Sequence, residues 1–196
     1  MEKSKLIVFL GVDGSGKSTL IDYFYKKNKS NYKKIHFVPD FFRNKKNKGV
    51  LNPHKEKKRN KLFSLLKLFY WTFNIKFSEI LQTFSKKNYI YDRNLSDVLI
   101  DPIRYRFSLS KKTLSFFLRM TKKPDLYVYV AGDIKKIHYR KKETSLTKLF
   151  ILDKKYKSFL KNKKNKIFIN GLMTKEQNYT ILKNKINFLW IFSNFF

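Results

Sequence analysis

The chain has 196 residues, no cysteine and a formal net charge of +31. The lack of cysteine excludes disulfides, thiolate metal sites and cysteine nucleophiles, as expected of a cytoplasmic protein, and no stretch reaches the roughly 20 uninterrupted apolar residues of a membrane span. The excess charge is mostly Lys, scattered along the chain with Asn, Ile, Phe and Tyr, whose codons are all A/T-rich. We therefore expect nonspecific attraction of polyanions, no specific nucleic-acid partner, and a single domain over residues 1–196.

The first informative segment is an apolar run at residues 6–10 followed by Gly-Val-Asp-Gly-Ser-Gly-Lys-Ser-Thr at residues 11–19. It matches G-x-x-x-x-G-K-[ST], the phosphate-binding P-loop between a strand and a helix. Its glycines let successive backbone N–H groups turn toward an anion, and the helix N-terminus adds partial positive charge. Lys17 would then reach the β- and γ-phosphates of a nucleoside triphosphate, and the Ser18 hydroxyl would ligate Mg²⁺. The expected nucleotide-binding set is Gly11, Asp13, Gly14, Ser15, Gly16, Lys17, Ser18 and Thr19.

Strand-like and helical stretches alternate along the rest of the chain, which predicts an α/β fold with a parallel sheet. Further strands are expected at residues 34–38, 89–91, 126–130 and 167–169, and helices after residue 19 and at 63–84, about 114–120, 133–142 and from 174 onward. Ser110 is the expected N-cap of the third of these helices, and Thr174 with Gln177 forms a capping box for the last. Residues 40–62 read as a mobile polar loop.

Two helices raise questions about burial. The helix at 63–84 has apolar residues on nearly every side, which predicts that it is mostly buried. Trp71 within it either packs in the core or stacks on a substrate base. The last helix ends in the apolar residues 188–192, which either pack within the monomer or form a dimer contact.

Asp92 and Arg93 directly follow the strand at 89–91. An acidic residue at the carboxyl end of a buried strand lies at the crevice where α/β sheets bind ligands. The fork of an arginine guanidinium suits a phosphate. The alternative is a structural Asp–Arg pair that closes a loop. The three histidines are too scattered for a metal site.

Together these motifs resemble the thymidylate kinase family. Its P-loop has an acidic residue at the third position, as Asp13 is here, and Asp92-Arg93 is similar to its Asp-Arg-Tyr/His motif. Lys-Pro-Asp-Leu at 123–126, Arg-Lys-Lys-Glu at 140–143 and Ile-Asn-Gly at 169–171 follow in the family's order, so the resemblance covers roughly residues 5 to 185. Asp97, Asp101-Pro102 and Arg-Tyr-Arg at 104–106 look closest to a thymidylate-kinase-like subgroup often associated with surface-polysaccharide genes.

The resemblance implies a three-layer P-loop nucleotide-kinase fold with about five parallel strands, ATP and Mg²⁺ as cofactors, and a homodimer as one arrangement. Asp13 would meet the acceptor's sugar hydroxyl or act with the metal, and Asp92 would position the metal's water shell. Arg93 would hold the acceptor phosphate. Arg140 would flank the adenine or enter a lid over residues 140–153, and residues 40–62 would lie on the acceptor side.

Thymidylate is the favoured acceptor, converted with ATP to thymidine diphosphate and ADP. The sequence also departs from the family: Asn94 replaces the aromatic or His after Asp-Arg, an acceptor-side arginine is missing after the second strand, and the lid lacks a second arginine. Two alternatives therefore stay open. One is a kinase of a sugar or another phosphorylated metabolite in surface-polysaccharide synthesis. The other is a non-catalytic P-loop protein that binds ATP.

Overall fold

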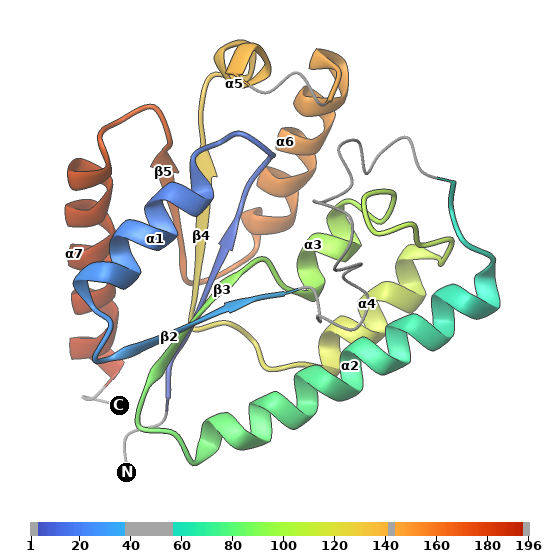
Figure 1. Cartoon of the computed structure of the whole chain (residues 1–196), viewed down its shortest axis with the longest axis horizontal. Coiled ribbons are helices and arrows are strands. Elements are labelled where there is room, and N and C mark those ends of the chain that lie inside the picture. The colour runs from blue at the N-terminus through green and yellow to red at the C-terminus, as the bar shows by residue number, and fades with distance from the viewer. Residues whose placement is uncertain (1–3, 38–56, 141–143, 194–196) are drawn as a thin grey trace, which may run out of the picture.

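The computed structural model describes residues 4–37, 57–140 and 144–193, with backbone only for residues 192 and 193 (Figure 1). It contains a five-stranded, all-parallel sheet with the order β2-β3-β1-β4-β5. The strands are β1 (Leu6–Leu10), β2 (Tyr32–His36), β3 (Asn88–Asp92), β4 (Leu126–Ala131) and β5 (Lys166–Asn170). The predicted parallel α/β fold is confirmed. The expected loop at 40–62 falls largely on residues 38–56, outside the described residues.

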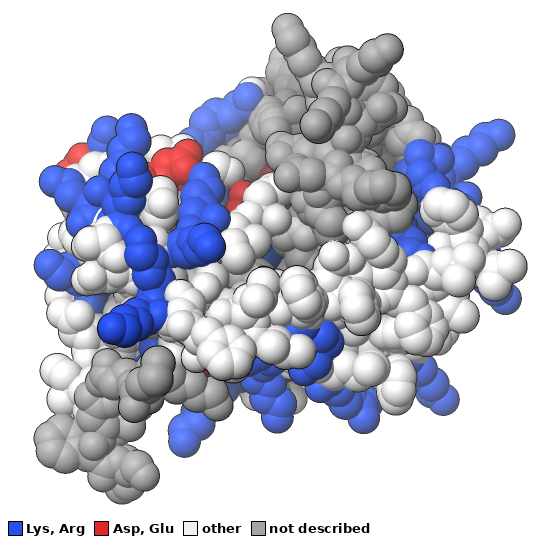
Figure 2. Space-filling model, turned by 60° about the horizontal axis from the view of Figure 1, so that its bottom comes forward, with Lys and Arg blue, Asp and Glu red and all other residues white. Residues whose placement is uncertain are grey.

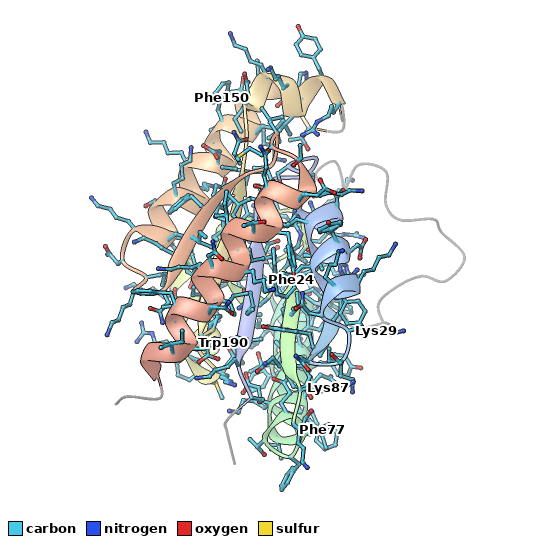
Figure 3. The ribbon with its side chains drawn as sticks, turned by 90° about the vertical axis from the view of Figure 1, so that its left-hand side faces the viewer. Phe24, Lys29, Phe77, Lys87, Phe150 and Trp190 are labelled. Atoms are coloured by element: carbon cyan, nitrogen blue, oxygen red, sulfur yellow. The ribbon has the colours of Figure 1, made fainter. Side chains whose placement is uncertain are left out.

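One face of the sheet is covered by α1 (Lys17–Lys27) and α7 (Lys175–Ser193), seen together in Figure 3. Leu20, Ile21 and Phe24 of α1 pack with Leu182 and Ile186 of α7 on the apolar side chains of the strands. The predicted capping box is confirmed, because Thr174 and Gln177 each accept the other's backbone N–H, at 3.1 and 3.2 Å.

The end of α7 bears on the first of the two possibilities for residues 188–192, packing within the monomer. Trp190 stacks on the buried Tyr32, with ring centroids 6.0 Å apart, and Leu189 packs against the same core. Phe188 and Ile191 are exposed. This helix end is thus partly core-packed.

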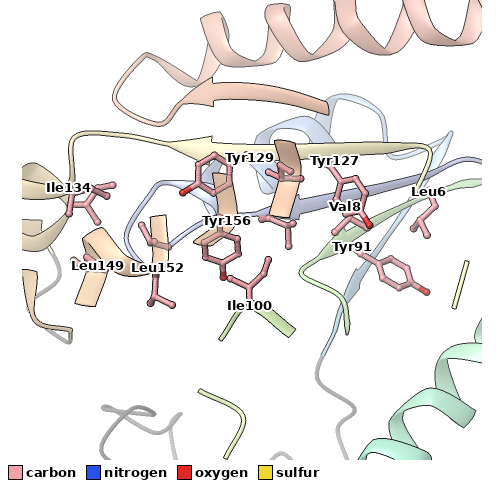
Figure 4. Packing of buried hydrophobic residues seen from close by; sticks show 14 of the residues in the cluster. Leu6, Val8, Tyr91, Ile100, Tyr127, Tyr129, Ile134, Leu149, Leu152 and Tyr156 are labelled. Atoms are coloured by element: carbon pink, nitrogen blue, oxygen red, sulfur yellow. The ribbon is translucent and has the colours of Figure 1, made fainter. Parts of the chain in front are cut away.

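The opposite face carries α5 (Ile134–Arg140) and α6 (Leu146–Lys161). Leu149, Leu152, Tyr156 and Leu160 of α6 lie against side chains of β1, β3 and β4 (Figure 4). The sequence analysis missed α6 and expected a lid over residues 140–153 instead. Residues 141–143 of that segment lie outside the described residues, and the chain is helical again from Leu146.

A third apolar cluster joins α2 (Lys61–Thr83), α3 (Leu95–Ile100) and α4 (Lys111–Met120) beside the sheet. Ser110 caps α4 as predicted, since its hydroxyl accepts the Thr113 N–H at 3.1 Å. Trp71 is at the centre of this cluster, 1% exposed and edge-on to Phe37, Tyr105 and Phe107. It is therefore a core residue, and no face of its ring is open for stacking on a base.

The prediction that α2 is mostly buried is wrong. Its buried positions lie along one side, while the other side exposes a row of large apolar residues: Leu62, Leu66, Phe69, Phe73, Phe77, Ile80 and Leu81. Figure 2 shows a broad uncharged area on the underside of the molecule, bordered by Lys and Arg. A helix that is apolar on every side is buried only if it has neighbours on every side, and among the described residues α2 has neighbours on one side only.

No helix in the described part of the chain is long and apolar enough to cross a bilayer.

Two smaller differences concern helix and strand limits. The second strand begins at Tyr32, two residues before the predicted start, because Tyr32 packs edge-on against Phe24 of α1 with ring centroids 5.1 Å apart. The six-residue helix α3 was not predicted. Asn94 caps it by accepting the Ser96 N–H at 3.1 Å.

The turn after β5 lies directly against the P-loop. The Gly171 N–H donates to the Ala131 carbonyl at 2.7 Å, which ties this turn to the end of β4. A Cβ on Gly171 would lie 1.8 Å from the Ser15 carbonyl oxygen, a contact between two backbones. Glycine is therefore required where the two segments meet.

We predict that Gly171→Ala lowers the free energy of unfolding by about 1–3 kcal/mol, because one backbone must shift to admit the methyl group. Urea unfolding measures the loss. Gly132→Ala is the matched control after β4, since its Cβ would meet a movable side-chain end, Ile137 Cδ1, at 3.1 Å. Equal stability of the two variants would contradict the prediction.

Candidate active site

A cavity of about 590 Å³ opens at the carboxyl ends of β1 and β3, at the N-terminus of α1. Three parts of the chain line it: the P-loop, the ends of β2 and β3, and two arginines from more distant segments. The lining residues are Asp13, Gly14, Gly16, Lys17, Ser18, Thr19, His36, Asp92, Arg93, Arg104 and Arg140. Nearly all predicted site residues thus meet in one place, while Gly11 and Ser15, which belong to the same loop, are buried and do not line the cavity.

The P-loop has backbone conformations that favour glycine. Gly11 has φ +149°, and a Cβ there would lie 2.7 Å from the Val130 carbonyl oxygen. Gly16 has φ +91° and immediately precedes the first turn of α1. The loop can therefore pass close to β4 and place the free N–H groups of the helix start beside the cavity.

Lys17 is 5% exposed, and its Nζ donates to the Val12 carbonyl at 3.4 Å. Burial and the neighbouring Arg93 charge lower the pKa of Lys17, Asp13, Asp92 and Asp97 oppose the shift, and the net pKa is about 8. The ammonium is thus held in a poorly solvated position where a bound polyphosphate would stabilise its charge.

Asp92 ends β3 and faces the same cavity. Its Oδ2 lies 3.3 Å from His36 Nδ1, whereas its Oδ1 is buried without a hydrogen-bond partner. Burial raises the pKa of Asp92, but the His36 contact, Lys17 and Arg93 lower it more, so the carboxylate is ionised. The unsatisfied oxygen and the exposed Ser18 hydroxyl are oxygen donors suited to Mg²⁺ or its water shell.

Arg93 is anchored on its inner side by Asp97. Its Nη1 donates to Asp97 Oδ2 at 2.6 Å and to the Tyr156 hydroxyl at 3.2 Å. Tyr105 also donates to Asp97 Oδ2, at 2.6 Å, and Tyr156 donates to Oδ1. The fully buried Asp97 carboxylate thus accepts hydrogen bonds at both oxygens, as a buried charge requires.

The tyrosines stay protonated in this cluster. Burial, then the Asp97 charge, raise the pKa of Tyr105 and of Tyr156 well above the ordinary value.

Arg93 has a left-handed backbone, with φ 70°, which is uncommon for a non-glycine residue. The Arg93 side chain is therefore held by its hydrogen bonds to Asp97 and Tyr156 and by the left-handed backbone conformation of Arg93 itself.

The outer side of Arg93 contacts the P-loop. Arg93 Nη2 donates to Asp13 Oδ1 at 2.7 Å, and Arg104 Nη1 donates to Asp13 Oδ2. Burial raises the pKa of Asp13, but Arg93, Arg104 and Lys17 lower it far more, so the carboxylate stays ionised. A P-loop carboxylate therefore bridges two arginines at the wall of the cavity.

Arg140 lies across the P-loop, where its Nη2 donates to the Gly14 carbonyl at 2.9 Å. Arg104 and His36 were not predicted as site residues. Arg104 reaches Asp13 from a segment ninety-one positions away in sequence, so only its place in the Arg-Tyr-Arg segment gave any signal. For His36, its position at the end of the second strand was the available signal.

Comparison with known proteins shows which solved structures share this fold. No protein-family model and no curated protein matches the chain. A solved deoxyadenosine kinase from M. mycoides, with dCMP and dCDP bound, matches with a TM-score of 0.64 and 19% identity, covering 93% of this chain and 98% of that one. The same enzyme with bound dATP gives a TM-score of 0.58, 19% identity, and coverage of 93% and 99%.

The thymidylate kinase of Candida albicans matches equally well, with a TM-score of 0.64, 16% identity, and coverage of 94% of this chain and 92% of that one. At these identities the likeness extends to the fold. This protein has the three-layer α/β P-loop kinase fold of these enzymes, with the arginine-lined cavity at its P-loop.

Proposed function

We propose that this protein is a P-loop phosphotransferase that moves the γ-phosphoryl group of ATP onto a nucleoside monophosphate, with thymidylate as the favoured acceptor. The observation that carries this proposal is the convergence of Lys17, Asp92 and Arg93 on one cavity. A protein that only binds ATP needs the P-loop. An ionised carboxylate and an anchored arginine facing the P-loop across the same cavity additionally suit a second, phosphorylated substrate.

Each residue has a part that follows from its position. The P-loop N–H groups and Lys17 hold the ATP phosphates, and Arg140 stabilises charge on the donor side beside Gly14. Ser18 and Asp92 would hold Mg²⁺, directly or through its water shell, and the bound ion would neutralise phosphate charge. An acceptor phosphate oxygen attacks the γ-phosphorus as its bond to the β–γ bridging oxygen breaks, giving ADP. The chain's residues need only position the two substrates and balance their charge.

Arg93 holds the acceptor phosphate in this proposal. Its Nη1 is committed to Asp97 and Tyr156, so the nitrogen that faces Asp13 is the one that meets the acceptor. Of the structural neighbours, the deoxyadenosine kinase is named for a nucleoside acceptor and the thymidylate kinase for a nucleotide acceptor. Two arginines at the acceptor end favour the phosphorylated acceptor.

A second candidate is a kinase of a phosphorylated sugar or related metabolite. Trp71 is buried, so the aromatic residue proposed to stack on a base is not available. The segment that resembles the polysaccharide-associated subgroup instead supplies acceptor-side contacts, through Arg104 to Asp13 and Tyr105 to Asp97. These observations concern the acceptor and leave the ATP half of the proposal unchanged.

We expect thymidine monophosphate to be phosphorylated at least about tenfold more efficiently than other nucleoside monophosphates, because the P-loop with Asp13 and the Asp92-Arg93 pair resemble those of thymidylate kinases. ADP release is measured with nucleoside monophosphates, deoxynucleosides and phosphosugars. Lys17→Ala protein, purified identically, measures contaminating kinases. Release with a phosphosugar alone moves the protein to the second candidate, and release with none favours a non-catalytic ATP-binding protein.

Arg93→Lys should lower kcat/KM for the acceptor by about a hundredfold or more, because one ammonium cannot contact Asp97 and the acceptor side together. The dissociation constant of ATP should stay within about twofold, measured by calorimetry. Arg119→Lys, an exposed change in the last turn of α4, is the control. Loss of ATP binding with unchanged acceptor kinetics would place Arg93 on the donor side.

ATP affinity should fall as pH rises through about 8, because Lys17 loses its charge there in the free protein. The affinity is thus full below this pH and reduced above it. In Lys17→Arg the guanidinium stays charged, so the profile between about pH 7 and 9 should be flat. Calorimetric titration of ATP at a series of pH values measures both. An equally steep fall in Lys17→Arg would assign the titration to another group.

A further inference from the structure

The contact of Asp13 with two arginines lies at the edge of the cavity. The side chains of Asp13 and Arg104 are 17% and 23% exposed, while that of Arg93 is 7% exposed. Both oxygens of the carboxylate are used, Oδ1 by Arg93 and Oδ2 by Arg104. Two guanidinium groups are thus held apart by one anion that small solutes can reach.

The carboxylate occupies the position at which an anion from the cavity would bind Arg93. Arg93 Nη1 is turned inward to Asp97 and Tyr156, and Nη2 is the nitrogen that donates to Asp13. An anion that accepts the same Arg93 Nη2 and Arg104 Nη1 hydrogens as Asp13 now does must therefore compete with that carboxylate. A phosphomonoester has the required oxygens and about twice the charge of a carboxylate near neutral pH.

We propose that a phosphomonoester dianion binds between Arg93 and Arg104 by displacing the Asp13 carboxylate, which fills this position while the acceptor is absent. The proposal rests on the kinase function above and assigns Arg104 as the second arginine of the acceptor-phosphate subsite. The sequence lacks the acceptor-side arginine expected after the second strand, and Arg104 would hold the acceptor phosphate in its place. Because the ligand needs two negative charges to displace the singly charged Asp13 carboxylate, this subsite selects phosphorylated acceptors over unphosphorylated ones.

The exchange also gives Asp13 a second position. Asp13 belongs to the P-loop, so a carboxylate that leaves the two arginines keeps Lys17 of the same loop as a cationic neighbour. From there it can accept a hydrogen bond from an acceptor hydroxyl. Removing the carboxylate should consequently have opposite effects on two measurements, with tighter anion binding and slower phosphoryl transfer.

Binding is measured by calorimetry with inorganic phosphate and with methyl phosphate at about pH 8, where both are largely dianionic. A non-hydrolysable ATP analogue with Mg²⁺ saturates the P-loop, so that the probe reports the other subsite. Asp13→Asn should bind the probes about tenfold more tightly than the wild type, because the competing charge is gone. Arg104→Gln should bind them about tenfold more weakly. Asp22→Asn, which removes an exposed carboxylate paired with Lys34, should change nothing.

A further measurement guards against loss of folding in Asp13→Asn. Without its bridge the variant places two like charges together, so its melting temperature should fall and then recover more on adding phosphate than that of the wild type. If Asp13→Asn binds phosphate no more tightly than the wild type, or Arg104→Gln binds it equally well, the proposal is wrong. If binding follows the expected pattern but no acceptor is phosphorylated, the subsite stands and the kinase function fails.

Discussion

The buried ion pair between Arg93 and Asp97 is the interaction on which the site depends. A guanidinium in a largely desolvated position is stable only where an anion and oriented hydroxyls replace water, and Asp97 with Tyr105 and Tyr156 provides both. These partners come from three segments: the start of α3, the stretch before α4, and the middle of α6. The pair therefore joins the helices on one side of the sheet to the end of β3. Removing the Arg93 charge would leave the Asp97 carboxylate buried with only hydroxyl donors, whereas removing the Asp97 charge would leave Arg93 paired with Asp13 alone.

The sequence predicted best what depends on neighbouring residues. The P-loop, the strand before it and the helix after it are local, and so are the cap at Ser110 and the capping box at Thr174. Asp92 and Arg93 were also predicted, because a strand end in a parallel sheet marks the ligand crevice wherever the strand lies. The partners of Arg93, which are Asp97, Tyr156 and Asp13, come instead from the packing of α3, α6 and the P-loop.

The features that the sequence did not predict depend on distant contacts. Arg104 becomes a site residue only because α3 and the following loop return the chain to the P-loop. The helix α6 has charged residues between its apolar ones, and its apolar face is recognisable only against the strands it covers. For α2 the composition indicated burial on all sides. Which side of a helix finds a neighbour is decided by the packing of the whole chain, and in α2 the buried side is the one that carries Leu68 and Trp71.

The exposed apolar row of α2 has a consequence for handling the protein in solution. Copies with a charge of +31 repel one another, and this repulsion opposes contact between their apolar surfaces. Salt shortens the range of the repulsion to about 10 Å at 0.1 M and about 3 Å at 1 M. The concentrated salt used to strip polyanions from a basic protein therefore also removes its colloidal protection. Light scattering along a salt series would show particle size growing with ionic strength, whereas a constant size would mean that the row is shielded in some other way.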